Sequence, residues 1–117
     1  MEFEVTRIIR APRESVFAWC TTYDEADPAR SKNPRFKTRK VLRSEGNIVE
    51  VEDFYEDTPV RRATVTLFPS ERWEAQLEGG LWQGRGIYRL KDMPEGTELR
   101  ITFQVKSMSP NATLEQL

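Results

Sequence analysis

Two charged residues, Arg7 and Asp53, interrupt runs of alternating apolar side chains on strand faces that we expect to point inward. A buried charge is costly unless it is paired, so these two either pair with each other or line a wet cavity. Tyr55 and Tyr88 add hydroxyl groups to the same predicted interior, and Trp73 adds a large ring. An apolar pocket with a few polar groups is the usual composition of a small-molecule site. We therefore predict that these residues line one cavity and contact a small hydrophobic or aromatic molecule, with ordinary core packing as the alternative for each.

An enzymatic function would need a buried acid or base, and Asp53 is the best candidate, with Tyr88 as a proton donor. The sequence contains no histidine and a single cysteine, Cys20. Histidine is the commonest general base and metal ligand, and one cysteine cannot form an internal disulfide. We expect no metal site, no histidine-dependent triad and no cofactor, and the sequence assigns no catalytic residues.

Four glycines lie close together in the second half of the chain: Gly79, Gly80, Gly84 and Gly86. A glycine-rich loop can bind phosphate, but these residues lie between and within predicted strands, and no helix N-terminus follows to hold an anion. We interpret them as a hairpin turn followed by a sharply bent strand, where glycine leaves room for a nearby ring. The ring that we expect there is Trp82 or Trp73.

Five basic residues and an aromatic residue, Phe36, gather between Arg35 and Arg43. On a β-surface such a run could bind single-stranded nucleic acid. Strand alternation divides the charges between two faces, however, and the acidic residues Glu50, Glu52 and Glu56 lie on the next predicted strand. We therefore prefer cross-strand ion pairing as the interpretation and expect no nucleic-acid partner.

The composition is that of a folded domain, because 38% of the residues are hydrophobic and the formal net charge is −1. A length of 117 residues fits a single domain, 1–117, with one core. The 18 basic and 19 acidic residues are mixed along the chain, which argues against a general attraction to nucleic acid or anionic membranes. No apolar stretch approaches the ~20 residues that cross a bilayer, and the N-terminus lacks a basic leader, which predicts a cytoplasmic protein without a membrane span.

A sheet must position these side chains, because most of the chain alternates between apolar and polar residues. Alternation predicts a first strand from Phe3 to Ile9, and Pro12 then suits the first turn of a helix that ends near Thr21. The polar segment 21–34 is predicted to be a loop with one helical turn near Glu25 or Ala29. Turn signals at 45–47, 57–59, 69–71, 79–80 and 94–96 leave six strands of roughly eight to twelve residues. Their short connections require an antiparallel meander.

Alternation also assigns the inward faces of these strands. The inward residues are Val49, Val51, Asp53 and Tyr55, then Ala63, Val65 and Leu67, then Trp73, Ala75 and Leu77, and finally Leu99, Ile101, Phe103 and Val105. We predict that the first strand pairs with the last, so that Val5 lies opposite the stretch 99–105. Such a one-sided sheet needs a cover, and residues 109–117 read as the first turns of a further helix, with Leu114 and Leu117 on one side.

The order of strand, short helices, six-strand meander and helix resembles the START-like, Bet v 1-like and polyketide cyclase superfamily. Ile8-Ile9-Arg10-Ala11-Pro12-Arg13-Glu14-Ser15-Val16-Phe17 looks like the family's opening, in which a strand ends at Ala-Pro and a helix presents Val-Phe or Val-Trp to the sheet. The stretch 69–100 resembles the family more closely, through Glu78-Gly79-Gly80-Leu81-Trp82-Gln83-Gly84, Gly86-Ile87-Tyr88-Arg89-Leu90 and Glu95-Gly96-Thr97-Glu98-Leu99. The similarity of pattern covers the whole chain and leans toward the small bacterial polyketide cyclase/dehydrase-like and lipid-transport branch.

The resemblance implies an α+β helix-grip fold, in which a seven-stranded curved antiparallel sheet lies over short N-terminal helices. Such proteins end in a long amphipathic helix, and this chain ends about where that helix would begin. We therefore expect a short or truncated C-terminal helix, with either a trimmed chain or a homodimer that covers the open sheet face. In function, the resemblance implies binding or carriage of a small hydrophobic, aromatic or lipid-like ligand. A cyclase- or dehydratase-like enzyme ranks second, and a protein or nucleic-acid interaction module third.

Overall fold

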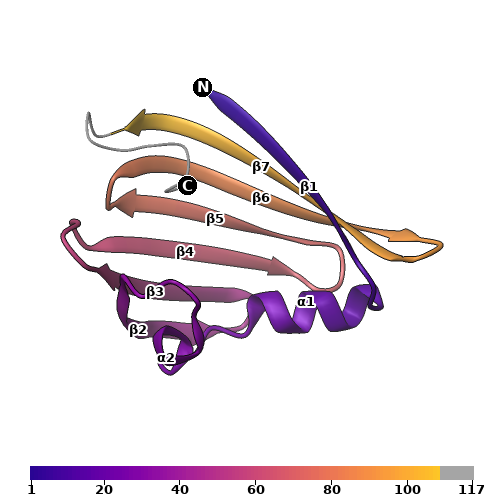
Figure 1. The fold of residues 1–117 in the computed structure, drawn as a ribbon, viewed down its shortest axis with the longest axis horizontal. Coiled ribbons are helices and arrows are strands. Elements are labelled where there is room, and N and C mark those ends of the chain that lie inside the picture. Colours follow the sequence, from indigo (N-terminus) through magenta and orange to yellow (C-terminus); the bar gives the residue numbers. More distant parts are fainter. Residues whose placement is uncertain (109–117) are drawn as a thin grey trace.

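The computed structural model describes residues 1–108, which form one antiparallel sheet with two short helices (Figure 1). The strands are β1 (Glu2–Ile9), β2 (Phe36–Glu45), β3 (Ile48–Tyr55), β4 (Arg61–Phe68), β5 (Arg72–Gly79), β6 (Trp82–Met93) and β7 (Gly96–Met108). The helices α1 (Arg13–Thr21) and α2 (Asp27–Arg30) lie between β1 and β2 in the chain. The seven strands follow the order β1-β7-β6-β5-β4-β3-β2 across the sheet. This is the α+β helix-grip architecture that the sequence predicts.

The strand pairing also follows the prediction. β1 returns beside β7, where Val5 lies opposite Ile101, and every other pair joins strands that are consecutive in the chain. Gly46 connects β2 to β3 with a φ of +57°, and Gly79 ends β5 with a φ of +73°. Glycine adopts these left-handed angles without the steric penalty that a Cβ would bring. The long strands and tight turns form a curved sheet, with α1 packed on its concave side (Figure 1).

The concave face of the sheet carries the core. Its fully buried members are Val49, Val51, Ala63, Val65, Trp73, Ala75, Leu77, Trp82, Leu90, Leu99 and Val105, joined by Val16 of α1. The residues that alternation assigned to the inward faces of β3, β4, β5 and β7 are buried or half-buried, so the predicted orientation of these four strands is confirmed. Full burial of one large aliphatic side chain is worth about 1.5–3 kcal/mol, so this face dominates the stability of the fold.

Helix α1 covers part of the concave face. It begins at Arg13, and Pro12 precedes it in an extended conformation (φ −61°, ψ 151°), so the proline lies just before the helix and not in its first turn. Val16 is 0% exposed, and the Phe17 ring packs edge-on against Trp73 with 5.8 Å between the ring centroids. Helix α2 is the single helical turn predicted within the segment 21–34.

One glycine of β6, Gly86, leaves room for a ring, but the ring is neither of the two tryptophans that we expected. A Cβ atom placed on Gly86 would lie 2.9 Å from Cε2 of Tyr88, and the nearest atoms around it all belong to that tyrosine. Gly86 and Tyr88 share one face of β6, and side chains in strands can lean along the strand direction. The Tyr88 ring therefore lies over the glycine.

The sequence predicts a further helix within residues 109–117, which lie outside the described residues. Neither of the helices in residues 1–108 is long and apolar enough to cross a bilayer. The same residues contain no group of three or more histidine, cysteine or acidic side chains that could hold a metal ion.

Candidate ligand-binding face

A row of aromatic rings lines the concave face from α1 to the start of β6. Phe17 contacts Trp73, Trp73 stacks on Tyr88 with 5.0 Å between ring centroids, and Tyr88 meets Phe103 edge-on at 6.2 Å. Phe103 in turn meets Trp82 edge-on at 5.7 Å. We call these five residues the aromatic row. Trp73 and Trp82 are 3% exposed, whereas the other three rings are half-buried, so the row is an apolar wall that still reaches solvent.

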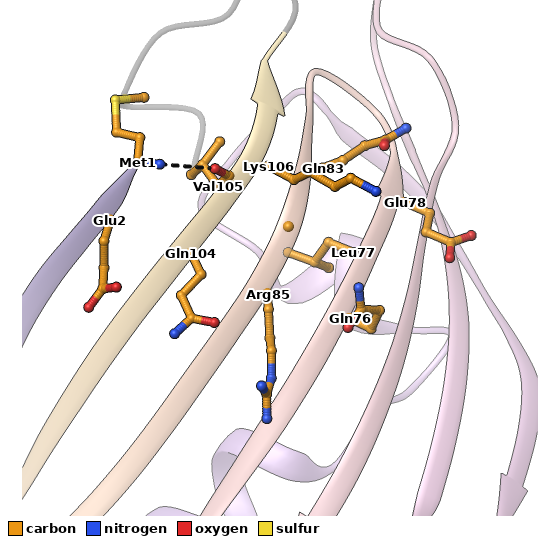
Figure 2. Close-up of a pocket in the computed structure, with 11 residues that line it drawn as sticks. Met1, Glu2, Gln76, Leu77, Glu78, Gln83, Arg85, Gln104, Val105 and Lys106 are labelled. Atoms are coloured by element: carbon orange, nitrogen blue, oxygen red, sulfur yellow. Dashed lines mark hydrogen bonds between the residues drawn. The ribbon is translucent and has the colours of Figure 1, made fainter.

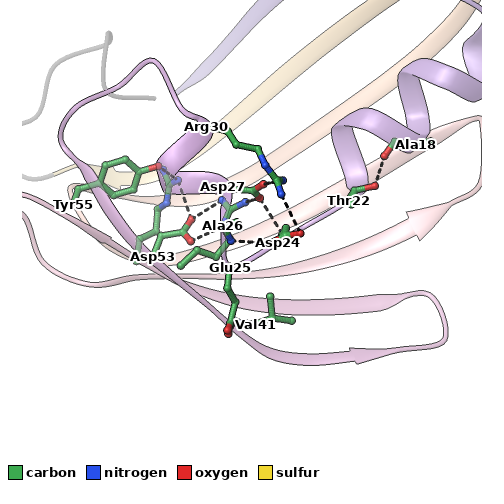
Figure 3. A network of polar contacts seen from close by, with 12 residues as sticks. Ala18, Thr22, Asp24, Glu25, Ala26, Asp27, Arg30, Val41, Asp53 and Tyr55 are labelled. Atoms are coloured by element: carbon green, nitrogen blue, oxygen red, sulfur yellow. Dashed lines mark hydrogen bonds and ion pairs between the residues drawn. The ribbon is translucent and has the colours of Figure 1, made fainter.

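A buried ionic network lies on the same face, across β2, β3 and β4 (Figure 3). Asp53 is 2% exposed, and its carboxylate accepts hydrogen bonds from Nε and Nη2 of Arg39 at 2.8 and 3.1 Å. Nη2 of Arg61 lies 3.5 Å from the same carboxylate and donates to the Tyr55 hydroxyl at 2.9 Å. Nη1 of Arg39 donates to Asp27 at 2.7 Å, which ties α2 to β2. We call these five residues the ionic network.

Strand register explains why these charges meet. Arg39 lies directly opposite Asp53, which lies directly opposite Arg61 on its other side. Each buried charge therefore faces an opposite charge, which offsets the large cost of taking it out of water. The Arg39 guanidinium also lies 5.2 Å from the ring centre of Tyr23 and 5.1 Å from that of Phe36, at distances typical of cation–π contacts.

The structure separates the five predicted site residues into three groups. Trp73 and Tyr88 stack within the aromatic row, and Asp53 and Tyr55 belong to the ionic network. Arg7 is exposed on the edge strand β1, where its guanidinium donates to the carbonyl of Thr6 at 3.1 Å. Pairing of Arg7 with Asp53 was one of our two interpretations, and it is wrong, because β1 and β3 are separated by β7, β6, β5 and β4. Contact of the five residues with a ligand stays a prediction.

Sequence reasoning missed Arg39 and Arg61, the two partners of Asp53. We expected the basic run that contains Arg39 to form cross-strand ion pairs, but we did not name Asp53 as its partner, because two register shifts in β2 change the phase of the alternation there. Arg61 carried a usable signal, because it has the same parity along β4 as the buried residues Ala63 and Val65.

Two further residues of the basic run form cross-strand ion pairs of the kind that we predicted. Arg43 on β2 bonds to Glu50 on β3 at 2.7 Å, and Lys37 lies 3.9 Å from Glu56. These side chains are used within the sheet, which leaves fewer of them for a nucleic-acid backbone.

The polar groups near the aromatic row are hydrogen-bond donors at neutral pH. Desolvation raises the pKa of Tyr88, against a smaller opposing effect of Arg61, and desolvation together with the nearby Tyr88 raises the pKa of Tyr23. Partial desolvation also raises the pKa of the Cys20 thiol, although the residue is exposed, so it stays protonated and weakly nucleophilic. The Asp53 oxygens are occupied by two guanidinium groups. This arrangement suits the binding of a ligand oxygen better than general-base or nucleophilic chemistry.

An open hollow of about 960 Å³ lies near the β5–β6 turn and the start of β1 (Figure 2). It is lined by Met1, Glu2, Gln76, Leu77, Glu78, Gln83, Gly84, Arg85, Gln104, Val105 and Lys106. Most of these side chains are polar and exposed, and none is a predicted site residue. Because an open polar hollow does not suit an apolar ligand, the aromatic row with the ionic network is the better candidate site.

Comparison with known proteins finds similarity in structure alone. No family model and no curated protein matches this sequence. TTHA0849 from Thermus thermophilus superimposes with a TM-score of 0.76 at 16% identity, over 95% of this chain and 77% of that one. The di-domain ARO/CYC StfQ from the steffimycin biosynthetic pathway gives 0.74 at 14% identity, over 95% of this chain and 38% of that one. A START superfamily protein from Mycobacterium smegmatis gives 0.69 at 16% identity, over 98% and 83%.

These likenesses concern the fold. The chain and the matched structures share the START-like architecture, which confirms the resemblance seen in the sequence. The chain spans 38% of the length of StfQ and 77% of that of TTHA0849. At such low identities, a common fold carries no activity from one protein to another.

Proposed function

Starting from the START-like fold, we propose that the protein binds a small hydrophobic, aromatic or lipid-like molecule against its concave face. The observation that carries this proposal is the aromatic row, whose rings Phe17, Tyr88 and Phe103 are half-buried on the concave face. Leu67 and Ile101 add half-buried aliphatic surface to the same face. Removal of apolar surface from water contributes about 25 cal/mol per Å², so an apolar ligand gains affinity by covering these groups.

The polar groups at one end of the face would orient the ligand. The Tyr88 hydroxyl keeps its proton at neutral pH, and Nε of Arg61 is buried with no hydrogen-bond partner. A carbonyl or hydroxyl oxygen of a ligand can accept from these donors, with a small movement of Arg61 to expose its Nε. The site should therefore prefer an apolar molecule with an oxygen at one end over a plain hydrocarbon.

Tryptophan fluorescence provides the test. Trp73 and Trp82 belong to the aromatic row, whereas Trp19 is 67% exposed on α1 and would add an unrelated signal. In a Trp19→Phe background, titration with oleate, with a hydroxylated anthraquinone and with the dye 1-anilinonaphthalene-8-sulfonate should change the emission saturably. Oleate and the anthraquinone should also displace the dye, because all three compounds would occupy one site.

Two variants on β7 show whether binding occurs on the concave face. Ile101→Gln places an amide on that face, and since a buried polar group without a partner costs about 1–3 kcal/mol, dye affinity should fall roughly tenfold. Gln104→Ala changes an exposed residue of the opposite face and should bind as the parent does. Equal affinity for all three proteins, or no saturable binding of any probe, would reject the proposal.

A cyclase- or dehydratase-like activity is the second candidate. It is favoured by the Tyr88 hydroxyl, whose pKa is raised by desolvation against a smaller opposing effect of the Arg61 charge, because these two groups are donors that could stabilise an enolate oxygen. Incubation with a linear poly-β-ketone thioester should then give a cyclised product lighter by one water, measured by mass spectrometry. Tyr88→Phe should slow that reaction while dye binding persists. A protein that only binds its ligand would form no more product than the spontaneous reaction in buffer without protein.

A further inference from the structure

The convex face carries a row of arginines that the ligand-binding proposal does not use. Arg72 on β5 lies directly opposite Arg89 on β6, and Arg89 lies directly opposite Arg100 on β7. We call these three residues the arginine row. Like charges that face each other across strands destabilise a sheet, so three in line are unfavourable unless something compensates them.

Carboxylates compensate the two outer arginines. Arg72 pairs through Nε with Glu74 at 3.0 Å, and Arg100 lies 3.3 Å from Glu98 and 3.6 Å from Glu4. Glu74 also contacts Arg85, so its charge is shared between two guanidinium groups. The acidic side chains beside the arginine row are therefore already engaged.

The central residue, Arg89, is exposed, and within residues 1–108 no carboxylate lies within ion-pair distance of it. Two of its neighbours on the convex face are the outer arginines, directly across on either side, and Lys91 follows two residues later on the same strand. Adjacent strands are about 4.8 Å apart, so the charges of all four side chains can act on one point above Arg89.

The Arg72 guanidinium is also held by a ring. It lies 3.8 Å from the ring centre of Phe68, the residue directly opposite on β4. A cation–π contact of this kind fixes the plane of the guanidinium and lowers the entropy that it loses when it binds a ligand. One side of the arginine row is therefore ordered before any anion arrives.

We propose that the arginine row binds a phosphate group, supplied either by a free phosphate compound or by the headgroup of an anionic lipid. A carboxylate presents two oxygens in one plane and suits one guanidinium, whereas a phosphate presents oxygens on several sides and can bridge two neighbouring arginines. Its negative charge would also replace the repulsion within the row by attraction. The site lies on the face opposite to the aromatic row and is independent of the ligand-binding proposal.

Titration of the full chain with inorganic pyrophosphate, followed by the arginine Nε–H signals in NMR, tests the proposal. The Arg89 signal should shift saturably, and Arg89→Gln should weaken binding by about tenfold, the loss expected for one charge-assisted contact. Arg89→Lys keeps the charge but loses the planar pair of donors, so its affinity for pyrophosphate should lie between those of the parent and Arg89→Gln. Arg62→Gln is the matched control, because Arg62 is also exposed on the convex face but pairs with Glu52 at 3.1 Å.

A second arm identifies the source of the phosphate. If a lipid headgroup is bound, the parent should sediment with vesicles of phosphatidylglycerol but not with vesicles of phosphatidylcholine. Arg89→Gln should then stay in the supernatant with both. Binding of pyrophosphate without retention on vesicles would support a free phosphate compound. The proposal is overturned if neither probe binds, if Arg62→Gln loses as much affinity as Arg89→Gln, or if polyglutamate binds more tightly than pyrophosphate.

Discussion

Asp53 and Glu52 are neighbours in the chain, but they form ion pairs on opposite faces of the sheet. The Asp53 side chain is 2% exposed and engages two arginines, whereas the Glu52 side chain is 20% exposed and pairs with Arg62, which is 56% exposed. Water and salt screen the outer pair, so it contributes roughly 0–1 kcal/mol. Loss of one partner from a buried pair leaves an unpaired charge inside, which costs about 3–5 kcal/mol. The same chemistry thus has a structural role on the concave face and a minor one on the convex face.

The largest expected effect comes from removing the buried charge. Asp53→Asn keeps the shape of the side chain but removes the carboxylate that Arg39 and Arg61 share, so Arg39 retains only Asp27 as a counter-charge and Arg61 loses its own. We expect the free energy of unfolding to fall by about 3 kcal/mol in urea titrations. The matched variant Glu52→Gln should change it by less than about 1 kcal/mol. Similar losses for both variants would contradict the contrast between the two faces.

A change that removes no charge sharpens the comparison. Gly86→Ala would place a methyl group 2.9 Å from the Tyr88 ring and push that ring off Trp73. Overpacking of this kind costs about 1–3 kcal/mol. Because only Tyr88 atoms are nearest to the new methyl group, the cost should shrink in a Tyr88→Leu background, measured as the coupling in a double-mutant cycle. An unchanged cost would show that the strand backbone, and not the ring, is the obstacle.

An intermediate effect is expected where the ionic network reaches the surface. The Asp27 side chain is 23% exposed and bonds to Arg39, which is 13% exposed. Asp27→Asn should lower the free energy of unfolding by about 1 kcal/mol, since solvent screens part of the interaction. It should also speed amide hydrogen exchange in α2, which Arg39 tethers to β2. Glu56→Gln is the control, as its pair with Lys37 is more than half exposed on both sides, and exchange in α2 should not respond to it.

The smallest expected effect is on the stability of the fold at acidic pH. Hydrogen bonds from Arg85 and Arg72 lower the pKa of Glu74 below its ordinary 4.5. A carboxyl with a lowered pKa stabilises the folded state above its unfolded pKa, and this contribution is lost as the pH falls below about 4.5. Glu74→Gln should therefore reduce the loss of unfolding free energy that acid causes, as measured by urea titration at neutral and acidic pH. The reduction should be less than about 1 kcal/mol, because the ion pairs of Glu74 lie near solvent. An acid response identical to the parent's would place the relevant carboxyl elsewhere.

Regular alternation made most of the fold predictable. In β7, the residues Leu99, Ile101, Phe103 and Val105 alternate without a break, so the inward face of this strand followed directly. Turn positions were equally readable, because residues such as Gly46 and Gly79 mark left-handed backbone. Wherever one periodic rule held over a whole strand, the structure agrees with the sequence.

The ionic network was only half predictable. Asp53 was recognised as a charge on an apolar face, but its partner Arg39 follows an irregular part of β2, where parity no longer reports direction. Arg7 has inward parity and is nevertheless exposed, because β1 is the last strand of the sheet and has a neighbour on one side only. The odd or even position of a residue along a strand gives the face of the sheet on which its side chain lies, whereas burial also depends on the side chains of the neighbouring strands.

The irregularity of β2 has a consequence for solubility. A free sheet edge is a template for strand addition by another chain, and bulges reduce that risk because they break the regular row of backbone groups. β2 has two such interruptions, and Glu25 accepts a hydrogen bond from the Val41 amide of this strand at 2.9 Å. The other edge, β1, pairs with β7 through eight consecutive residues without a break. Where concentrated protein begins to self-associate through strand addition, contact should therefore start at β1, and charged residues added there should delay it.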